Sequence, residues 1–140
     1  MIGFHHNDGG REASGRKGTA GDCVARSLAI ATGRSYDECY SALASAMKKA
    51  GHPKSARNGI PRTVSTKVFK EFGLTKISLP KAKPTLTEAH EQYGTCIAKT
   101  TKHMMALRDG YLQDIYDIRT YEWEGVVRER KATTVWIPTQ

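Results

Sequence analysis

The chain of 140 residues has few cysteines and no long apolar segment. Its three cysteines, Cys23, Cys39 and Cys96, are odd in number and widely spaced, which argues against a disulfide framework and a CxxC metal site. No run of about 18 apolar residues is present, so the sequence predicts no membrane segment. The glycine-rich stretch 1–21 lacks the apolar core of a signal peptide, and we therefore expect a cytoplasmic protein. No internal repeat is visible.

The chain does have an ordinary globular composition and a strong positive charge. Hydrophobic residues make up 39% and charged residues 26%, and the length suits one domain over 1–140. The formal net charge of +8 favours a polyanion such as nucleic acid, or an acidic protein, as partner. Solvated faces that only keep the protein soluble would carry the same charge. The basic residues fall in two groups: Lys48, Lys49, Lys54, Arg57, Arg62, Lys67 and Lys70, and then Arg128, Arg130 and Lys131.

Apolar spacing and capping signals predict four helices in the first two thirds of the chain. Ser35 and Thr85 each stand three residues before a glutamate, as in a capping box. The apolar residues after Ser35 trace one helical face, and we interpret Cys39 as a packed core residue on it. The predicted helices cover 23–32, 35–50, 64–72 and 85–93, and the stretch 52–61 is predicted to be a basic loop.

From residue 95 onwards the apolar pattern is that of short strands. The dipeptide Asp109-Gly110 is a strong signal for a two-residue type I′ hairpin. Helices followed by an antiparallel sheet predict an α+β fold. The expected strands are 96–100, 103–108, 111–116 and 133–137, with a weaker candidate at 74–79, and residues 117–130 are mixed and charged.

Residues 21–33 place a thiol at the first position of an apolar helix. Asp22 suits the N-cap and Gly33 the position after the helix. The free N–H groups and the positive end of the helix dipole favour a thiolate there, and they can also bind a developing oxyanion. Cys23 is therefore a candidate nucleophile, although a small buried cysteine would suit the same position.

The predicted hairpin brings a histidine and a carboxylate together. A two-residue loop puts Met105 opposite Asp114, so that His103 and Asp114 become diagonal neighbours on one face, within reach of a hydrogen bond. A loop longer by one residue would bring Asp117 there instead. A histidine held by a carboxylate and facing Cys23 is the arrangement of a thiol hydrolase. Taken alone, His103 would be a strand histidine and Asp114 a solubilising edge charge.

Four short motifs are spread over most of the chain. They are Asp8-Gly9-Gly10-Arg11, Gly21-Asp22-Cys23-Val24-x-Arg26, Ala29-Ile30-Ala31-Thr32-Gly33-x-x-Tyr36 and His103-x-x-Ala106-x-x-Asp109-Gly110-x-x-x-Asp114. The order of cysteine, histidine and acid resembles the papain-like cysteine hydrolases, and the motifs are similar to those of a group of small, largely uncharacterised phage and bacterial proteins. The resemblance implies a papain-like fold with helices packed on a C-terminal sheet, a Cys23, His103 and Asp114 triad and, for a phage protein, the host cytoplasm.

The glycine-rich arm 1–21 departs from the papain pattern. Papain-type enzymes place a glutamine several residues before the cysteine as an oxyanion donor, and residues 16–20 contain none. Asn7, Arg11, Thr19 or backbone N–H groups are the alternatives. The arm is expected either to fold over the cleft or to be a flexible leader. Because its adjacent histidines, His5 and His6, have no further ligand at suitable spacing, we expect no metal site.

The leading hypothesis is a thiol hydrolase that cleaves a peptide, isopeptide or amide bond in a protein or peptide substrate, without a cofactor. The alternative is a non-catalytic basic binding module of a phage that contacts nucleic acid or a host protein. Acyl transfer on the same triad is a third possibility, because it differs only in the nucleophile that resolves the thioester.

Overall fold

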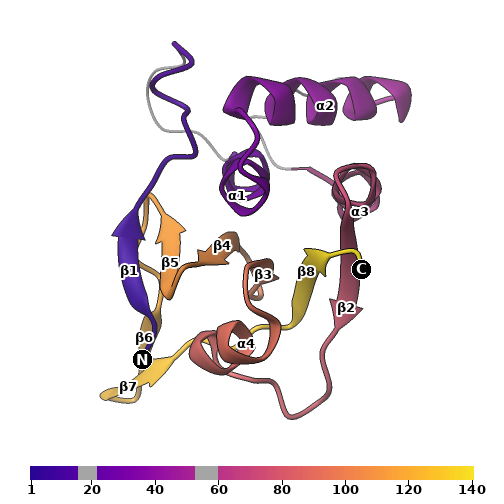
Figure 1. The fold of residues 1–140 in the computed structure, drawn as a ribbon. Coiled ribbons are helices and arrows are strands. Elements are labelled where there is room, and N and C mark those ends of the chain that lie inside the picture. Colours follow the sequence, from indigo (N-terminus) through magenta and orange to yellow (C-terminus); the bar gives the residue numbers. More distant parts are fainter. Residues whose placement is uncertain (16–21, 53–59) are drawn as a thin grey trace.

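The computed structural model describes residues 1–15, 22–52 and 60–140, which form a six-stranded sheet, a separate two-stranded hairpin and four helices (Figure 1). This is an α+β arrangement with a mostly antiparallel sheet, as the sequence predicted. The helices are α1 (Cys23–Thr32), α2 (Tyr36–Lys49), α3 (Arg62–Glu71) and α4 (Leu86–Tyr93). The strands are β1 (Gly3–His6), β2 (Leu74–Ser78), β3 (Cys96–Lys99), β4 (Met104–Arg108), β5 (Tyr111–Asp114), β6 (Thr120–Trp123), β7 (Val126–Glu129) and β8 (Thr134–Pro138). Most of the predicted basic loop 52–61 lies outside the described residues.

The strand order of the large sheet is β1-β5-β4-β3-β8-β2. All neighbours are antiparallel except β1 and β5, which run parallel with His6 opposite Asp114. The sequence pattern missed β1, because glycine and histidine residues give no strand periodicity. Its backbone pairing with β5 nevertheless holds the start of the glycine-rich arm against the end of β5, and the N–H of Asn7 donates to the carbonyl of Asp114.

Helices cover both faces of the sheet. α1, α2 and α3 lie on one face, and α4 lies on the other (Figure 1). Adjacent strand residues alternate between the two layers: Met104 packs on the α1 side and Met105 on the α4 side. Trp136 is fully buried on the α1 side and meets Phe69 of α3 edge to face, with ring centroids 5.3 Å apart. Within the described chain, no helix has the length and apolar character needed to cross a bilayer.

The β4–β5 hairpin has the predicted register. Arg108 pairs with Tyr111, and both loop residues have positive φ, 55° at Asp109 and 85° at Gly110, as a type I′ turn requires. Glycine suits the second loop position because it has no Cβ to oppose this conformation. β5 ends at Asp114, rather than at residue 116, so this carboxylate lies where the strand leaves the sheet.

The helix ends follow the predicted caps with one exception. Thr85 forms a complete capping box with Glu88, and the Ser35 hydroxyl accepts from the backbone N–H of Glu38. Gly33 ends α1 in the left-handed conformation, with φ 74°. Asp22 occupies the N-cap position of α1, but its side chain makes no capping hydrogen bond, so the expected cap is wrong. Its carboxylate is bound by other side chains, described below.

A second hairpin, β6–β7, lies within the mixed and charged stretch 117–130, for which no strand was predicted. Its turn residues, Glu124 and Gly125, also have positive φ, 50° and 75°. Glu-Gly is a weaker turn signal than Asp-Gly, because glutamate adopts the left-handed region less readily than aspartate does. The hairpin lies at the opposite side of the molecule from α2 (Figure 1).

Candidate active site

Cys23 is the first residue of α1, and its side chain is only partly buried. Val24 and Leu28, on the same helix, are buried in the hydrophobic core between α1 and the sheet. The side chain of His103 and the backbone of Met104 lie near enough to the thiol to lower its pKa. The structure therefore brings the helix N-terminus and the start of β4 together at the thiol.

His103 immediately precedes β4, and its ring connects Cys23 to Asp114. The Nε2 atom lies 2.5 Å from Oδ2 of Asp114. Because one ring nitrogen is occupied by the carboxylate, the other, Nδ1, is left for the thiol. The side chain is 22% exposed, so a small molecule can reach the histidine while most of the ring remains shielded from water.

Asp114 is held from several directions at the end of β5. Its Oδ1 atom accepts from the N–H of Ile115 at 2.7 Å and lies 3.3 Å from Nη2 of Arg26, while Oδ2 faces His103. The carboxylate is almost fully buried. Asp117, the alternative acid, instead pairs with Arg119 at 2.8 Å on the surface. Of the two acids, Asp114 is the one that contacts His103.

Arg26 links this carboxylate to a second one. Its guanidinium also binds Asp22, one helical turn earlier, and the Arg26 side chain is 2% exposed. Asp22 in turn accepts hydrogen bonds from Nη1 of Arg11 at 2.7 Å and from the Tyr36 hydroxyl at 2.5 Å. Asp22 is thus a buried partner of two arginines, and the described residues contain one continuous polar chain from Tyr36 to Cys23.

The role of Arg26 was not predicted from the sequence, although a signal for it is present. An arginine among the apolar residues of a core helix, four positions after an aspartate, is spaced for a buried ion pair. Its position also explains the glycine at position 9. A Cβ on Gly9 would lie 3.0 Å from the carbonyl oxygen of Arg26, and φ is +71° there. Only glycine lets the arm approach α1 this closely.

The surroundings shift the pKa values of the thiol and the imidazole in opposite directions. Burial opposes ionisation of Cys23, but hydrogen bonds from His103 and the Met104 backbone, with the positive charges of His103 and Arg26, lower its pKa overall. Burial also works against the charged form of His103, yet its hydrogen bonds to Asp114 and Cys23 raise its pKa to about 9. Both shifts favour the thiolate–imidazolium form of the pair.

The other two cysteines are inert by comparison. Cys39 packs in the α2 core, as predicted, and Cys96 is buried on β3. Burial raises the pKa of each thiol to about 12. Since the thiolate is the reactive form, Cys23 is the cysteine whose surroundings favour reaction.

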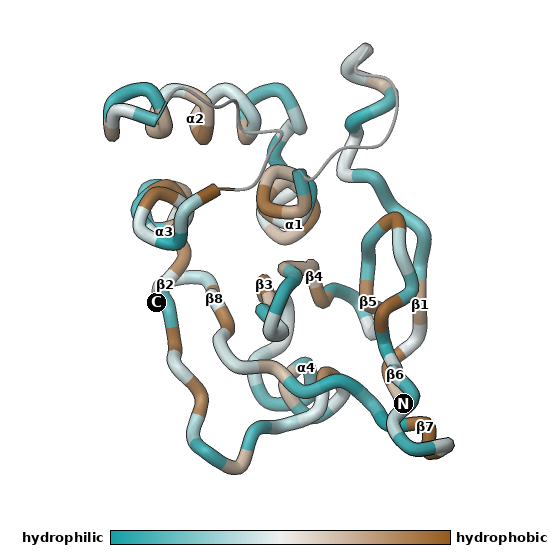
Figure 2. Tube along the Cα trace, turned by 180° about the vertical axis from the view of Figure 1, so that it is seen from behind, coloured by the Kyte–Doolittle hydropathy of each residue, from teal (hydrophilic) through white to brown (hydrophobic). Residues whose placement is uncertain are grey.

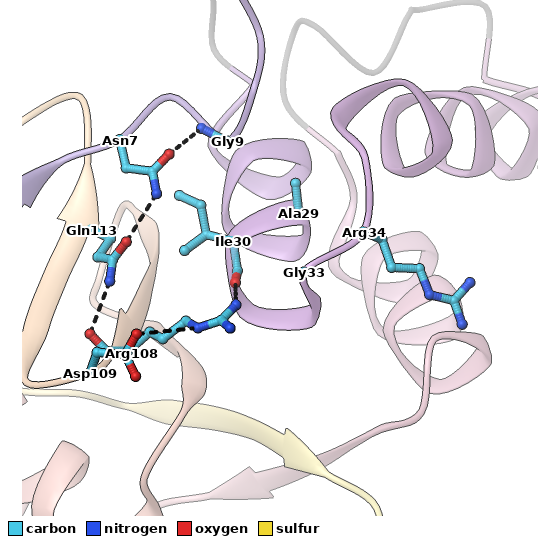
Figure 3. A pocket seen from close by; sticks show the side chains of 9 residues that line it. All are labelled: Asn7, Gly9, Ala29, Ile30, Gly33, Arg34, Arg108, Asp109 and Gln113. Carbon is cyan, nitrogen blue, oxygen red and sulfur yellow. Dashed lines mark hydrogen bonds and ion pairs between the residues drawn. The ribbon is translucent and has the colours of Figure 1, made fainter.

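The four suggested oxyanion donors lie in different places. Asn7 lines a cleft of about 340 Å³ beside α1 (Figure 3). Its side-chain amide donates to Gln113 at 2.9 Å and accepts from the backbone N–H of Gly9, so both ends of the amide already have partners. Arg11 is engaged by Asp22 and Tyr36. Thr19 lies outside the described residues. The remaining donors are backbone N–H groups at the start of α1, which the Asp22 side chain does not cap.

His5 and His6 are the last two residues of β1. The ring of His5 meets that of Tyr111 edge to face, with centroids 6.0 Å apart. Among residues 1–15, 22–52 and 60–140, no group of three or more potential ligands could hold a metal ion.

No protein-family model matches the sequence, and neither a curated protein nor a solved structure is significantly similar to it. The function therefore has to be inferred from the chemistry of the site itself.

Proposed function

We propose that the protein is a papain-like thiol hydrolase that cleaves a peptide, isopeptide or amide bond, with Cys23 as nucleophile. His103 acts as general acid and base, and Asp114 orients its ring. The observation that carries the proposal is a thiol at a helix N-terminus beside an imidazole that lowers its pKa, with the imidazole itself hydrogen-bonded to the Asp114 carboxylate. These are the groups and the placement that nucleophilic catalysis by cysteine requires.

In the first half-reaction, the Cys23 thiolate adds to the carbonyl carbon, and the carbonyl π electrons move onto the oxygen. The His103 imidazolium gives a proton to the leaving nitrogen as the carbon–nitrogen bond breaks, which leaves a thioester and a free amine. In the second half, water loses a proton to the now neutral imidazole and adds to the thioester. The carbonyl reforms, the thiolate leaves, and a carboxylic acid is released.

The backbone N–H groups at the start of α1 are the donors that we assign to the oxyanion. The first N–H groups of a helix have no acceptor within that helix, and they point towards its N-terminal end, where the sulfur lies. The Asp22 side chain makes no capping hydrogen bond to these donors. Because Asp22 turns its carboxylate to Arg11, Arg26 and Tyr36, it does not compete with the oxyanion for them.

The raised pKa of His103 supports an amide rather than an activated ester as the substrate. An amine is a poor leaving group unless it is protonated as it departs, and a pKa of about 9 keeps the proton on the ring at neutral pH. A protein or peptide in a reducing cytoplasm is the substrate class that we propose, since a catalytic thiolate survives best under reducing conditions.

Reaction with p-nitrophenyl acetate tests the proposal without knowledge of the natural substrate. We expect one acetyl group to be added rapidly to Cys23, detected by mass spectrometry of the intact and digested protein. Cys23→Ala removes the adduct, whereas the matched variant Cys39→Ala leaves it unchanged. Iodoacetamide is expected to label Cys23 before Cys39 and Cys96. Equal, slow labelling of all three thiols in the folded protein would overturn the proposal.

The fate of the acetyl group separates hydrolysis from acyl transfer. A hydrolase releases acetate at a rate that added hydroxylamine changes little, whereas a transferase passes the group to the added amine. Asp114→Asn is expected to slow turnover strongly, because the ring loses the partner that fixes its tautomer. If Asp114→Asn leaves the acetylation rate unchanged, Asp114 has no part in the reaction.

A further inference from the structure

The β6–β7 hairpin presents one face with exposed aromatic rings. Tyr121 and Trp123 lie on alternate positions of β6, and the register places Arg128 opposite Tyr121 and Val126 opposite Trp123. These four side chains share a face, because strand residues alternate. The Trp123 side chain is 61% exposed and Val126 50%. Figure 2 shows apolar residues at this free hairpin, away from the helical layer of α1 to α3.

The alternation also separates the charges of the hairpin. Glu122 and Glu129 point to the opposite face, where Glu129 accepts from the Thr87 backbone of α4 at 2.8 Å. Arg128 and Arg130, two positions apart, share the aromatic face, and the Arg130 guanidinium lies 5.4 Å from the centre of the Tyr121 ring. One side of the hairpin therefore presents aromatic rings and Arg128 to solvent, with the partly buried Arg130 beside the Tyr121 ring.

A basic pocket lies next to this face. It is lined by Tyr121 and Arg130 of the aromatic face and by residues that flank β3 and β8 of the large sheet. Its volume is about 330 Å³, and none of its lining residues is acidic. The Arg130 Nε atom is enclosed there without a hydrogen-bond partner in the described part of the chain. An anionic oxygen entering the pocket would meet the Arg130 guanidinium and the neighbouring threonine hydroxyl groups. The lining residues are Lys83, Thr100, Thr101, Tyr121, Arg130, Lys131 and Thr133.

We propose that this face binds single-stranded nucleic acid, with a base stacked on Trp123 and phosphates held by Arg128, Arg130 and Lys131. Exposed rings next to cations fit a strand whose bases are free to stack and whose backbone is anionic. A duplex keeps its base faces covered, and an acidic peptide would use the cations but not the rings. The inference is independent of the hydrolase proposal, because neither Trp123 nor these cations belong to the thiol site.

The two tryptophans provide the test, because Trp136 is fully buried while Trp123 is exposed. The probe is an oligothymidylate or oligouridylate of about ten nucleotides, within the range covered by one binding module. Stacking is expected to quench the red-shifted emission of Trp123. Trp123→Leu removes the quenching, since only Trp136 still emits, and weakens binding by about ten-fold as measured by fluorescence anisotropy of a labelled oligonucleotide.

The salt dependence tests the phosphate contacts. Arg130→Gln is expected to lower the slope of log affinity against log salt by about 0.7, the value for one phosphate contact with a single strand. Lys48→Gln removes the same charge from the exposed end of α2 and should leave the slope unchanged. The Cys23→Ala chain should bind like the wild type.

Three outcomes would overturn the proposal. One is binding without Trp123 quenching, and another is an equal salt slope in Arg130→Gln and Lys48→Gln. The third is equally tight binding of a duplex or of an oligoglutamate of matched charge, which would show that the face recognises charge alone.

Discussion

The pKa of His103 is the property on which the site most directly depends, and replacement of Asp114 by asparagine tests it. The rise from 6.5 to about 9 corresponds to about 3 kcal/mol of preference for the protonated ring in the folded protein. Hydrogen bonding to Asp114 is the largest of the effects that raise the pKa, followed by the bond to Cys23. We therefore expect Asp114→Asn to lower the pKa of His103 more than Cys23→Ala does.

The same shift predicts how stability changes with pH. A group whose pKa is higher in the folded state stabilises the protein fully below its unfolded value of 6.5. This contribution is lost as the pH rises through about 9, where the folded protein also releases the proton. The free energy of unfolding of the wild type should thus lose up to about 3 kcal/mol from this group between these pH values, and Asp114→Asn should lose much less.

NMR titration of the histidine Cε1–H signals measures the pKa directly, and urea denaturation at several pH values measures the stability. The four other histidines serve as internal references in the same spectra. A wild-type His103 that titrates near 6.5 would refute the reasoning. So would an unchanged His103 pKa in Asp114→Asn, because the carboxylate would then not be the group that holds the proton on the ring.

Substitutions at three further positions test the surrounding structure by urea denaturation. Arg26→Met leaves buried Asp22 and Asp114 without their shared cation and should cost about 3–5 kcal/mol; a loss below about 1 kcal/mol would contradict the buried network. Thr85→Ala removes the capping box of α4 and should cost about 1 kcal/mol. Gly110→Ala adds a Cβ that meets no other atom, so its expected cost of about 1 kcal/mol comes only from the backbone conformation with φ 85°. Gly110→Asn should cost less, because asparagine adopts this left-handed conformation more readily than alanine does.

The part of the site on the hairpin could be predicted because a two-residue turn fixes the register of its strands. Once Asp109-Gly110 is recognised, the diagonal relation of His103 and Asp114 follows from counting. The position of Cys23 at a helix start was equally accessible, since the apolar spacing and Gly33 define α1.

The contacts around the Cys23 site and the smaller strands could not be predicted in the same way. Asp22 has the sequence signature of an N-cap, but tertiary partners take its carboxylate, and only the folded arrangement supplies them. β1 pairs with β5 through its backbone, and its four residues include a glycine and two histidines, which give no clear apolar alternation to detect. The turn of the β6–β7 hairpin has Glu124 where Asn or Asp would have given a clear signal.

The buried ions beside the thiol limit how this sequence can change. Arg11 and Arg26 balance Asp22 and Asp114, and all four lie almost entirely out of water. Replacing one of these residues by a neutral one leaves its buried partner as an unpaired charge, which the protein interior solvates poorly. Replacing an arginine and an aspartate together keeps the net charge of the buried group at zero. Natural or engineered variation at these positions is therefore expected to arise in complementary pairs, and a double variant should be less damaged than its two single variants together.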